Sequence, residues 1–200
     1  MHPNNAFRFT ADDPALAFVA ATGFAHLFGM TPDGPRVAHV PVLVLASGRL
    51  RFHLANTNAL TRHLDGATVL ASVGGPGSYV SPNWYADPVG NVPTWNYRTA
   101  EIEGNVTALG WDDLRDLLDR SAVTFEPRVG EDWTMAKMDP VRRDAMMRAI
   151  TAFELLPTAI RSTDKNSQNR SEADAQHVVA AMEAIGDAAG AAEIRRTRGW

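Results

Sequence analysis

Residues 24–54 read FAHLFGMTPDGPRVAHVPVLVLASGRLRFHL and largely set the expected fold. Residues 24–29 alternate between two faces, as in a strand with one buried side. Residues 37–45 are apolar on both faces, and Pro41 within them predicts a sheet edge or a bulge. Residues 50–54 alternate again, and Gly-containing turn signals separate the three segments. Strands joined by short turns predict an antiparallel sheet.

The rest of the chain adds helices and further strands to this sheet. Helices are expected from Asp13 to Gly23, over 56–64, over 111–125, from Asp139 to about 150 and over about 171–189. Strands are expected over 69–73, 99–109 and 152–156, and a long irregular loop over 74–93. The expected fold is therefore mainly β with helices (α+β), an antiparallel barrel decorated by helices, in a single domain over 1–200.

Composition excludes several classes of chemistry. The 200 residues contain no cysteine, which excludes a thiol nucleophile, a thiolate zinc site and an iron–sulfur cluster. Redox chemistry would have to come from a bound cofactor. The net charge of −4 argues against a protein that binds nucleic acid over much of its surface, because such proteins are usually basic. The chain begins without a signal-peptide pattern, and its longest apolar run is too short for a bilayer. We expect a cytoplasmic protein with no membrane contact.

Two neighbouring segments mix aromatic rings with hydroxyl and amide groups. Residues 78–85 read SYVSPNWY, and residues 92–97 read VPTWNY. A planar polar heteroaromatic ligand needs such a mixture, because rings stack on it while polar groups bond to its edges. The alternative is that the aromatic rings pack the core and the polar groups cap turns.

A polar segment precedes the last expected helix. Residues 164–170 read DKNSQNR, so two cations and several neutral donors lie just before a helix N-terminus, an arrangement that suits a phosphate. Residues 52–58 offer a weaker anion site where a strand meets a helix, with helix capping as the alternative reading. For residues 164–170 the alternative is a solvated polar loop. The six histidines show no tight metal-ligand spacing, so we predict no metal site.

Taken in order, these segments resemble the PaiB-like family, described as FMN-binding negative transcriptional regulators. The resemblance runs along nearly the whole chain. It rests on the blocks His39-Val40-Pro41, Phe52-His53-Leu54-Ala55-x-x-Asn58, Gly75-Pro76-x-x-Tyr79-Val80-Ser81-Pro82-x-Trp84-Tyr85, Val92-Pro93-Thr94-Trp95-Asn96-Tyr97 and Lys165-x-Ser167-Gln168-Asn169-Arg170. The chain departs from the family in the last block, where Asp164 precedes the lysine and Asn166 replaces a leucine.

The resemblance implies a split β-barrel of the pyridoxamine 5′-phosphate oxidase type, working as a homodimer with FMN at the subunit interface. On this basis we expect the isoalloxazine to lie against residues 39–41 and 84–95. We expect the phosphate to be held by some of His53, Asn58, Lys165, Gln168 and Arg170. The residues expected to bind FMN are His39, Val40, Pro41, His53, Leu54, Asn58, Tyr79, Ser81, Trp84, Thr94, Trp95, Asn96, Lys165, Gln168, Asn169 and Arg170. No catalytic residue is assigned.

The sequence leaves three functions open. The first is an FMN-binding protein with flavin-dependent oxidoreductase activity, in which the protein positions and tunes the flavin. The second is a ligand-sensing transcriptional regulator, with DNA as a partner and without catalysis. The sequence shows no helix-turn-helix, and its basic stretch Arg195-Arg196-x-Arg198 is expected to be a solvated tail. The third is a haem-binding split barrel with His53 or His39 as axial ligand.

Overall fold

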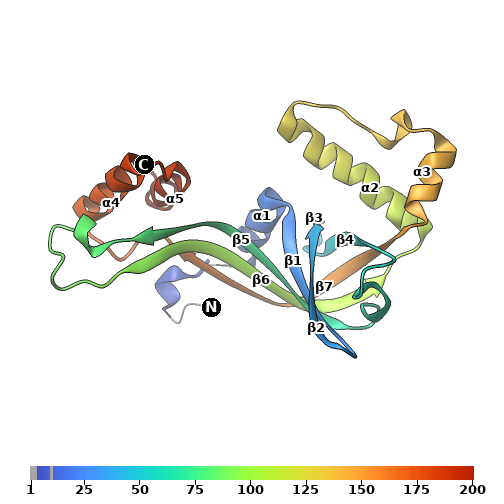
Figure 1. Cartoon of the computed structure of the whole chain (residues 1–200), viewed down its shortest axis with the longest axis horizontal. Coiled ribbons are helices and arrows are strands. Elements are labelled where there is room, and N and C mark those ends of the chain that lie inside the picture. Colours follow the sequence, from blue (N-terminus) through green and yellow to red (C-terminus); the bar gives the residue numbers. More distant parts are fainter. Residues whose placement is uncertain (1–3, 10) are drawn as a thin grey trace. The chain divides into compact units, whose positions relative to one another are not determined.

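The computed structural model describes residues 4–9 and 11–200. This part of the chain is an α+β structure whose seven strands form one sheet, in the order β2-β1-β5-β6-β7-β4-β3 (Figure 1). The strands are β1 (Phe24–Thr31), β2 (Gly34–Pro41), β3 (Leu43–Val44), β4 (Leu50–Ala55), β5 (Thr68–Val80), β6 (Thr94–Ala108) and β7 (Ile150–Lys165). The α-helices are α1 (Asp12–Thr22), α2 (Trp111–Phe125), α3 (Pro140–Met147), α4 (Glu172–Ala184) and α5 (Ala188–Arg198). The predicted fold class, antiparallel and mainly β with helices, is confirmed.

Strands β1 and β2 form the hairpin that the sequence predicts. Their antiparallel register runs from Phe24 opposite Pro41 to Thr31 opposite Gly34. Gly34 has a φ of +100°, which only glycine adopts without strain, so it closes the turn. Pro41 ends β2 at the edge of the sheet, as predicted, because an edge strand tolerates a missing N–H. The predicted strand over 37–45 is interrupted at Val42, and β3 follows as a separate strand.

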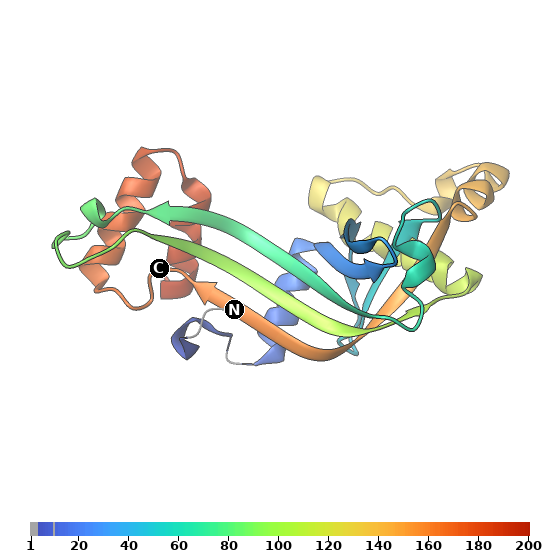
Figure 2. The same cartoon turned by 60° about the horizontal axis from the view of Figure 1, so that its bottom comes forward.

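The chain divides into two compact units, and β5, β6 and β7 contribute residues to both. Unit 1 comprises Met1–Ala15, Gly74–Ala100 and Arg161–Trp200, and unit 2 comprises Leu16–Val73 and Glu101–Ile160. Figure 2 shows the three long strands running next to one another in the order of the sheet.

Unit 2 contains the hairpin, helix α2 and most of the short strands. Strand β2 contacts β4 in addition to its partner β1, so the sheet curls towards a barrel. Phe52 and Phe153 stack in the core with ring centroids 5.6 Å apart. Helix α2 contacts β3 and β4 and buries Leu114 and Leu117. The bounds of α2 are those predicted from the sequence.

Unit 1 contains a second core around the two C-terminal helices. Helices α4 and α5 pack against each other, and α4 also contacts a short 3-10 helix over Pro82–Trp84. Their buried side chains join Val80 and Tyr85 in one hydrophobic cluster. No helix within the described residues is both long and apolar enough to cross a membrane.

The three long strands extend well beyond their predicted limits. The prediction of an irregular loop over 74–93 is wrong for residues 74–80, which belong to β5. The glycines in this stretch weaken the local strand signal, but hydrogen bonding to neighbouring strands satisfies the backbone and keeps it extended. Similar pairing lengthens β6 and β7, which sequence alternation marked only over 99–109 and 152–156.

Residues 56–64 do not form the predicted helix. The Asn58 side chain accepts a 3.0 Å hydrogen bond from the Leu60 backbone N–H, and the Thr61 hydroxyl donates to the Ala55 carbonyl oxygen. These local bonds satisfy the backbone in turns, leaving only a 3-10 turn over Thr61–His63.

The helix predicted over about 171–189 ends at Ala184, and a second helix that was not predicted, α5, follows over Ala188–Arg198. Gly186 ends the first with a φ of +83°, and the Asp187 side chain caps the second by accepting from the Gly190 N–H. The basic stretch after residue 194 lies within α5, where its arginines have partners within the protein. The prediction of a solvated tail is therefore wrong.

Candidate functional site

The residues expected to bind a cofactor fall into two groups, one in each unit. Unit 2 holds His39, Val40, Pro41, His53, Leu54 and Asn58. Unit 1 holds Tyr79, Ser81, Trp84, Thr94, Trp95, Asn96, Lys165, Gln168, Asn169 and Arg170.

An aromatic pair stands open at the surface of unit 1. Tyr79 of β5 and Trp95 of β6 meet edge to face, with ring centroids 5.9 Å apart. The two residues are 47% and 57% exposed, although both rings are large and apolar. Trp84, in contrast, packs against the core of unit 1, and Ser81 caps a 3-10 turn by accepting from the Asn83 N–H. The packing and capping alternatives therefore hold for Trp84 and Ser81, while Tyr79 and Trp95 remain available to stack on a ligand.

Two cations lie beside this aromatic segment. The Lys165 amine donates to the Thr94 hydroxyl and, at 2.8 Å, to the Trp95 carbonyl oxygen. Burial lowers the pKa of Lys165 below its ordinary value, and the nearby charge of Arg170 lowers it further. The Arg170 guanidinium lies 4.2 Å from the centre of the Tyr85 ring and donates to the Asn91 side chain.

Neither of these cations is paired with an acid in the described part of the chain. All the hydrogen-bond acceptors named above for Lys165 and Arg170 are neutral oxygens. Two neighbouring positive charges without a carboxylate within ion-pair distance are stabilised by an anion. The arrangement thus suits a phosphate, as the sequence predicts for residues 164–170.

The neutral side chains of the same segment mainly hold its shape. Asn96 is buried and donates to the Ser167 hydroxyl at 3.0 Å. The Gln168 side chain makes two hydrogen bonds to the preceding backbone: it accepts from the Asn166 N–H and donates to the Asp164 carbonyl. Ser167 has a φ of +61°, unusual for a residue other than glycine. Asn169 is exposed.

The acid that departs from the family pattern is neutralised within the protein. The buried Asp164 carboxylate accepts two hydrogen bonds, of 2.8 and 2.9 Å, from Arg196 of α5. It also accepts one from the Asn166 side chain, the other departure from the pattern. Asp164 therefore has its own positive partner and a defined structural role beside Lys165.

In unit 2, His39 is one of a pair of histidines. His26 and His39 are directly opposite each other on β1 and β2, and their Nδ1 atoms lie 2.7 Å apart. Both residues are exposed, whereas Val40 and Leu54 point into the core. The Asn58 side chain caps a turn, which is the alternative reading for that residue.

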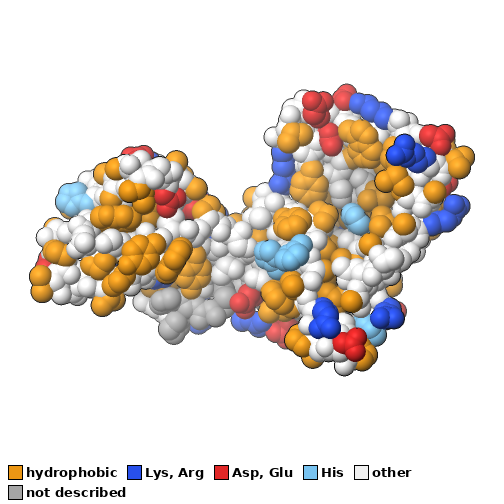
Figure 3. All heavy atoms as spheres, in the orientation of Figure 1, with side chains coloured by type: hydrophobic (Ala, Val, Ile, Leu, Met, Phe, Trp, Pro, Cys, Tyr) orange, Lys and Arg blue, Asp and Glu red, His pale blue; other side chains and the backbone are white. Residues whose placement is uncertain are grey.

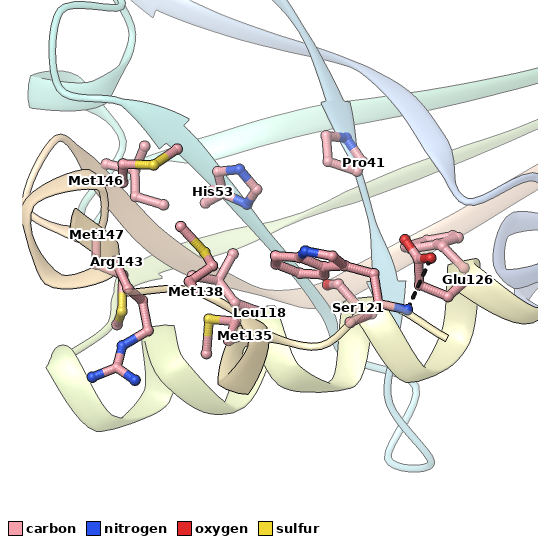
Figure 4. A pocket seen from close by; sticks show the side chains of 14 residues that line it. Pro41, His53, Leu118, Ser121, Glu126, Met135, Met138, Arg143, Met146 and Met147 are labelled. Carbon is pink, nitrogen blue, oxygen red and sulfur yellow. Dashed lines mark hydrogen bonds between the residues drawn. The ribbon is translucent and has the colours of Figure 1, made fainter. Parts of the chain in front are cut away.

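His53 of β4 faces a cavity of unit 2 (Figure 4). Burial lowers the pKa of its imidazole, so the neutral form is favoured. The cavity has a volume of about 460 Å³ and is lined mostly by apolar side chains. The structure thus places His53 in surroundings quite different from those of Lys165 and Arg170.

Comparison with known proteins assigns the chain to a family. A family model described as "Putative FMN-binding domain" matches residues 1–158. The chain belongs to this family of FMN-binding domains. Its cofactor is FMN, as predicted from the sequence.

Individual relatives of this FMN-binding domain agree with the assignment. The chain is 26% identical over 177 residues to "Protease synthase and sporulation protein PAI 2" of Bacillus subtilis, covering 86% of this chain and 84% of the relative. The flavocytochrome Anf3 from Azotobacter vinelandii has a similar fold, with a TM-score of 0.64 and 15% identity, over 82% of this chain and 72% of that one. The FAD and heme binding protein from Mycobacterium smegmatis has a TM-score of 0.61 at 17% identity, over 79% and 73%. These likenesses confirm the split-barrel fold.

The residues of unit 1 fit FMN. The cofactor combines a planar ring system with a phosphate dianion, and unit 1 offers an open aromatic pair together with two cations that lack an acidic partner among the described residues. Lys165 and Arg170 would hold the phosphate, and Tyr79 and Trp95 would contact the ring.

Sequence reasoning missed the residues that support these cations. Arg198 of α5 donates to the backbone carbonyls of Ser167 and Arg170, at 2.8 and 2.7 Å, and so fixes the loop that follows Lys165 and carries Arg170. The Gly199 C-cap and the basic last turn are typical of a helix end, and this signal could have revealed α5.

Proposed function

We propose that this FMN-binding domain is a flavin-dependent oxidoreductase that works as a homodimer. The observation that carries the proposal is the pair of cations, Lys165 and Arg170, beside the exposed Tyr79–Trp95 pair. The chain has no cysteine, so FMN supplies the exchange of electrons when it is bound. The protein itself binds the phosphate, orients the ring and shields one side of it.

An exposed face of the β1–β2 hairpin supports the homodimer. Phe24 and Phe28 of β1 are 47% and 45% exposed, and Val37 of β2 is 44% exposed. Hydrophobic and histidine side chains gather on the face that Figure 3 presents. Exposed apolar sheet faces of this kind usually mark an interaction site. A second copy of the chain covering this face would bury it.

The regulator function has less support in the structure. The arginines that form the basic stretch of the sequence all have partners within the protein: Arg195 pairs with Glu183 at 2.7 Å, Arg196 with Asp164, and Arg198 with backbone carbonyls. They are therefore poorly available to DNA phosphates. DNA binding and a cytoplasmic location remain predictions of the sequence.

Absorption spectroscopy of the purified protein, with and without added FMN, tests the proposal. We expect the flavin bands to shift on binding, and NADH or NADPH to bleach them under anaerobic conditions. Binding without reduction by either donor would retain the FMN site but overturn the oxidoreductase. A Soret band in place of flavin bands would favour the haem-binding alternative.

A further inference from the structure

A methionine-rich cavity in unit 2 is not explained by the FMN site of unit 1. Helix α2, helix α3 and the segment between them line one side of it, and β4 and the start of β7 line the other (Figure 4). Four of the seven methionines of the chain line it: Met135, Met138, Met146 and Met147. Two aromatic side chains, Phe125 and Trp133, complete much of the wall. Its volume of about 460 Å³ lies in the range of small-molecule sites.

Three of the polar side chains of the cavity wall are already engaged by protein groups. Ser121 donates to the Leu117 carbonyl, Glu126 accepts from the Trp133 N–H, and Arg143 pairs with Asp144 at 2.9 Å. The imidazole of His53 has no hydrogen-bond partner among residues 4–9 and 11–200. Because a neutral imidazole carries one donor and one acceptor, His53 offers a ligand one polar contact of either kind, and the indole N–H of Trp133 is a further donor in the wall.

The chemistry of this wall selects its ligand. Methionine sulfur atoms make favourable contacts with aromatic rings, and flexible thioether chains adapt to ligands of different shape. Arg143 is paired with Asp144, so an anionic ligand would meet no free positive charge in the described part of the wall. Glu126 accepts from a neutral backbone N–H and keeps its negative charge, but the wall around it is mostly apolar, which favours a neutral ligand. The cavity is also much larger than a metal ion requires.

We propose that it binds a neutral aromatic molecule that carries one hydroxyl or carbonyl oxygen, which hydrogen-bonds to His53. This cavity is lined by residues of unit 2 and includes none of the unit 1 residues proposed to hold FMN.

Isothermal titration calorimetry with 1-naphthol as the probe tests the proposal, with naphthalene as the matched ligand without the oxygen. We expect 1-naphthol to bind the wild-type protein at one site, and His53→Leu to weaken it about three- to tenfold, the value of one hydrogen bond. Naphthalene should bind the wild type and His53→Leu equally well, which also shows that the variant retains the folded cavity.

Two further variants locate the site. Met138→Trp, which fills the cavity, should abolish binding of both probes, whereas Met30→Trp, at an exposed methionine away from the cavity, should not change it. Saturating FMN should leave 1-naphthol binding unchanged. The proposal fails if 1-naphthol does not bind, if it binds Met138→Trp as it binds the wild type, if His53→Leu leaves its affinity unchanged, or if FMN displaces it. None of these results bears on whether FMN itself binds at Lys165 and Arg170.

Discussion

The Lys165 amine donates a 2.8 Å hydrogen bond to the backbone carbonyl oxygen of Trp95. This bond joins the end of β7 to the start of β6, two segments that lie 70 residues apart in the sequence. It brings a cation and an exposed aromatic ring into one place, which neither segment achieves alone. Much of the proposed FMN site depends on this relationship.

Removing the two cations of unit 1 should weaken FMN binding. For the double variant Lys165→Ala/Arg170→Ala we expect a loss of about 10- to 100-fold at low salt, because charge-assisted hydrogen bonds to the phosphate are lost. The loss should shrink as salt rises, since salt already screens these charges in the wild type. Fluorescence titration of FMN measures both effects.

The control is Lys137→Ala/Arg36→Ala, which removes the other lysine of the chain and an exposed arginine. Equal affinity in the two double variants would discard the phosphate assignment.

The buried imidazole of His53 should make stability depend on pH. Its pKa is lowered in the folded protein by burial, relative to about 6.5 in the unfolded chain. Between the two values the unfolded chain binds more protons, so the free energy of unfolding falls as pH decreases below about 6.5. Urea unfolding of wild type and His53→Leu across this range should show a weaker pH dependence in the variant. His63→Leu serves as the control, and a slope unchanged in His53→Leu would contradict the prediction.

Gly104 of β6 should not tolerate a side chain. A Cβ atom at this position would lie 2.3 Å from the carbonyl oxygen of Leu156, on the neighbouring strand β7. We expect Gly104→Ala to destabilise the protein by about 1–3 kcal/mol, because the backbone of β7 must shift. Gly74→Ala, in β5, meets nothing within 4 Å and should be near neutral. Chemical denaturation gives the free energy of unfolding of each variant. Equal values for the two would contradict the prediction and show that the β7 backbone shifts at little cost.

A charge on the exposed face of the β1–β2 hairpin should weaken the proposed homodimer. We expect Phe28→Glu to shift the protein towards the monomer by at least about tenfold in dimer affinity, since dimerisation would bury an unpaired carboxylate. The control is Val123→Glu on α2, an exposed apolar residue elsewhere in unit 2. Sedimentation velocity at several concentrations measures the monomer–dimer equilibrium of Phe28→Glu and of the control variant. A wild-type monomer, or a Phe28→Glu dimer as tight as the wild type, would exclude this face.

Local patterns in the sequence determined a large part of the fold. The β1–β2 hairpin and helix α2 formed as predicted, because alternation, turn glycines and an apolar stripe act over a few neighbouring residues. The ordered blocks that resemble the PaiB-like family also predicted the FMN-binding family and its cofactor, since the order of several short motifs along a chain is far more specific than any one of them.

Tertiary structure decided the length of the long strands and the chemistry of the sites. Pairing with neighbouring strands kept residues 74–80 extended despite their glycines, and α5 supplied Arg196 and Arg198 as partners rather than a solvated tail. It also assembled four methionines around His53. These outcomes depend on groups distant in the chain, whose mutual burial and hydrogen bonding no local pattern encodes. The sequence by itself therefore determined the family and the main elements, whereas only the folded chain decided which polar groups remain free to bind a ligand.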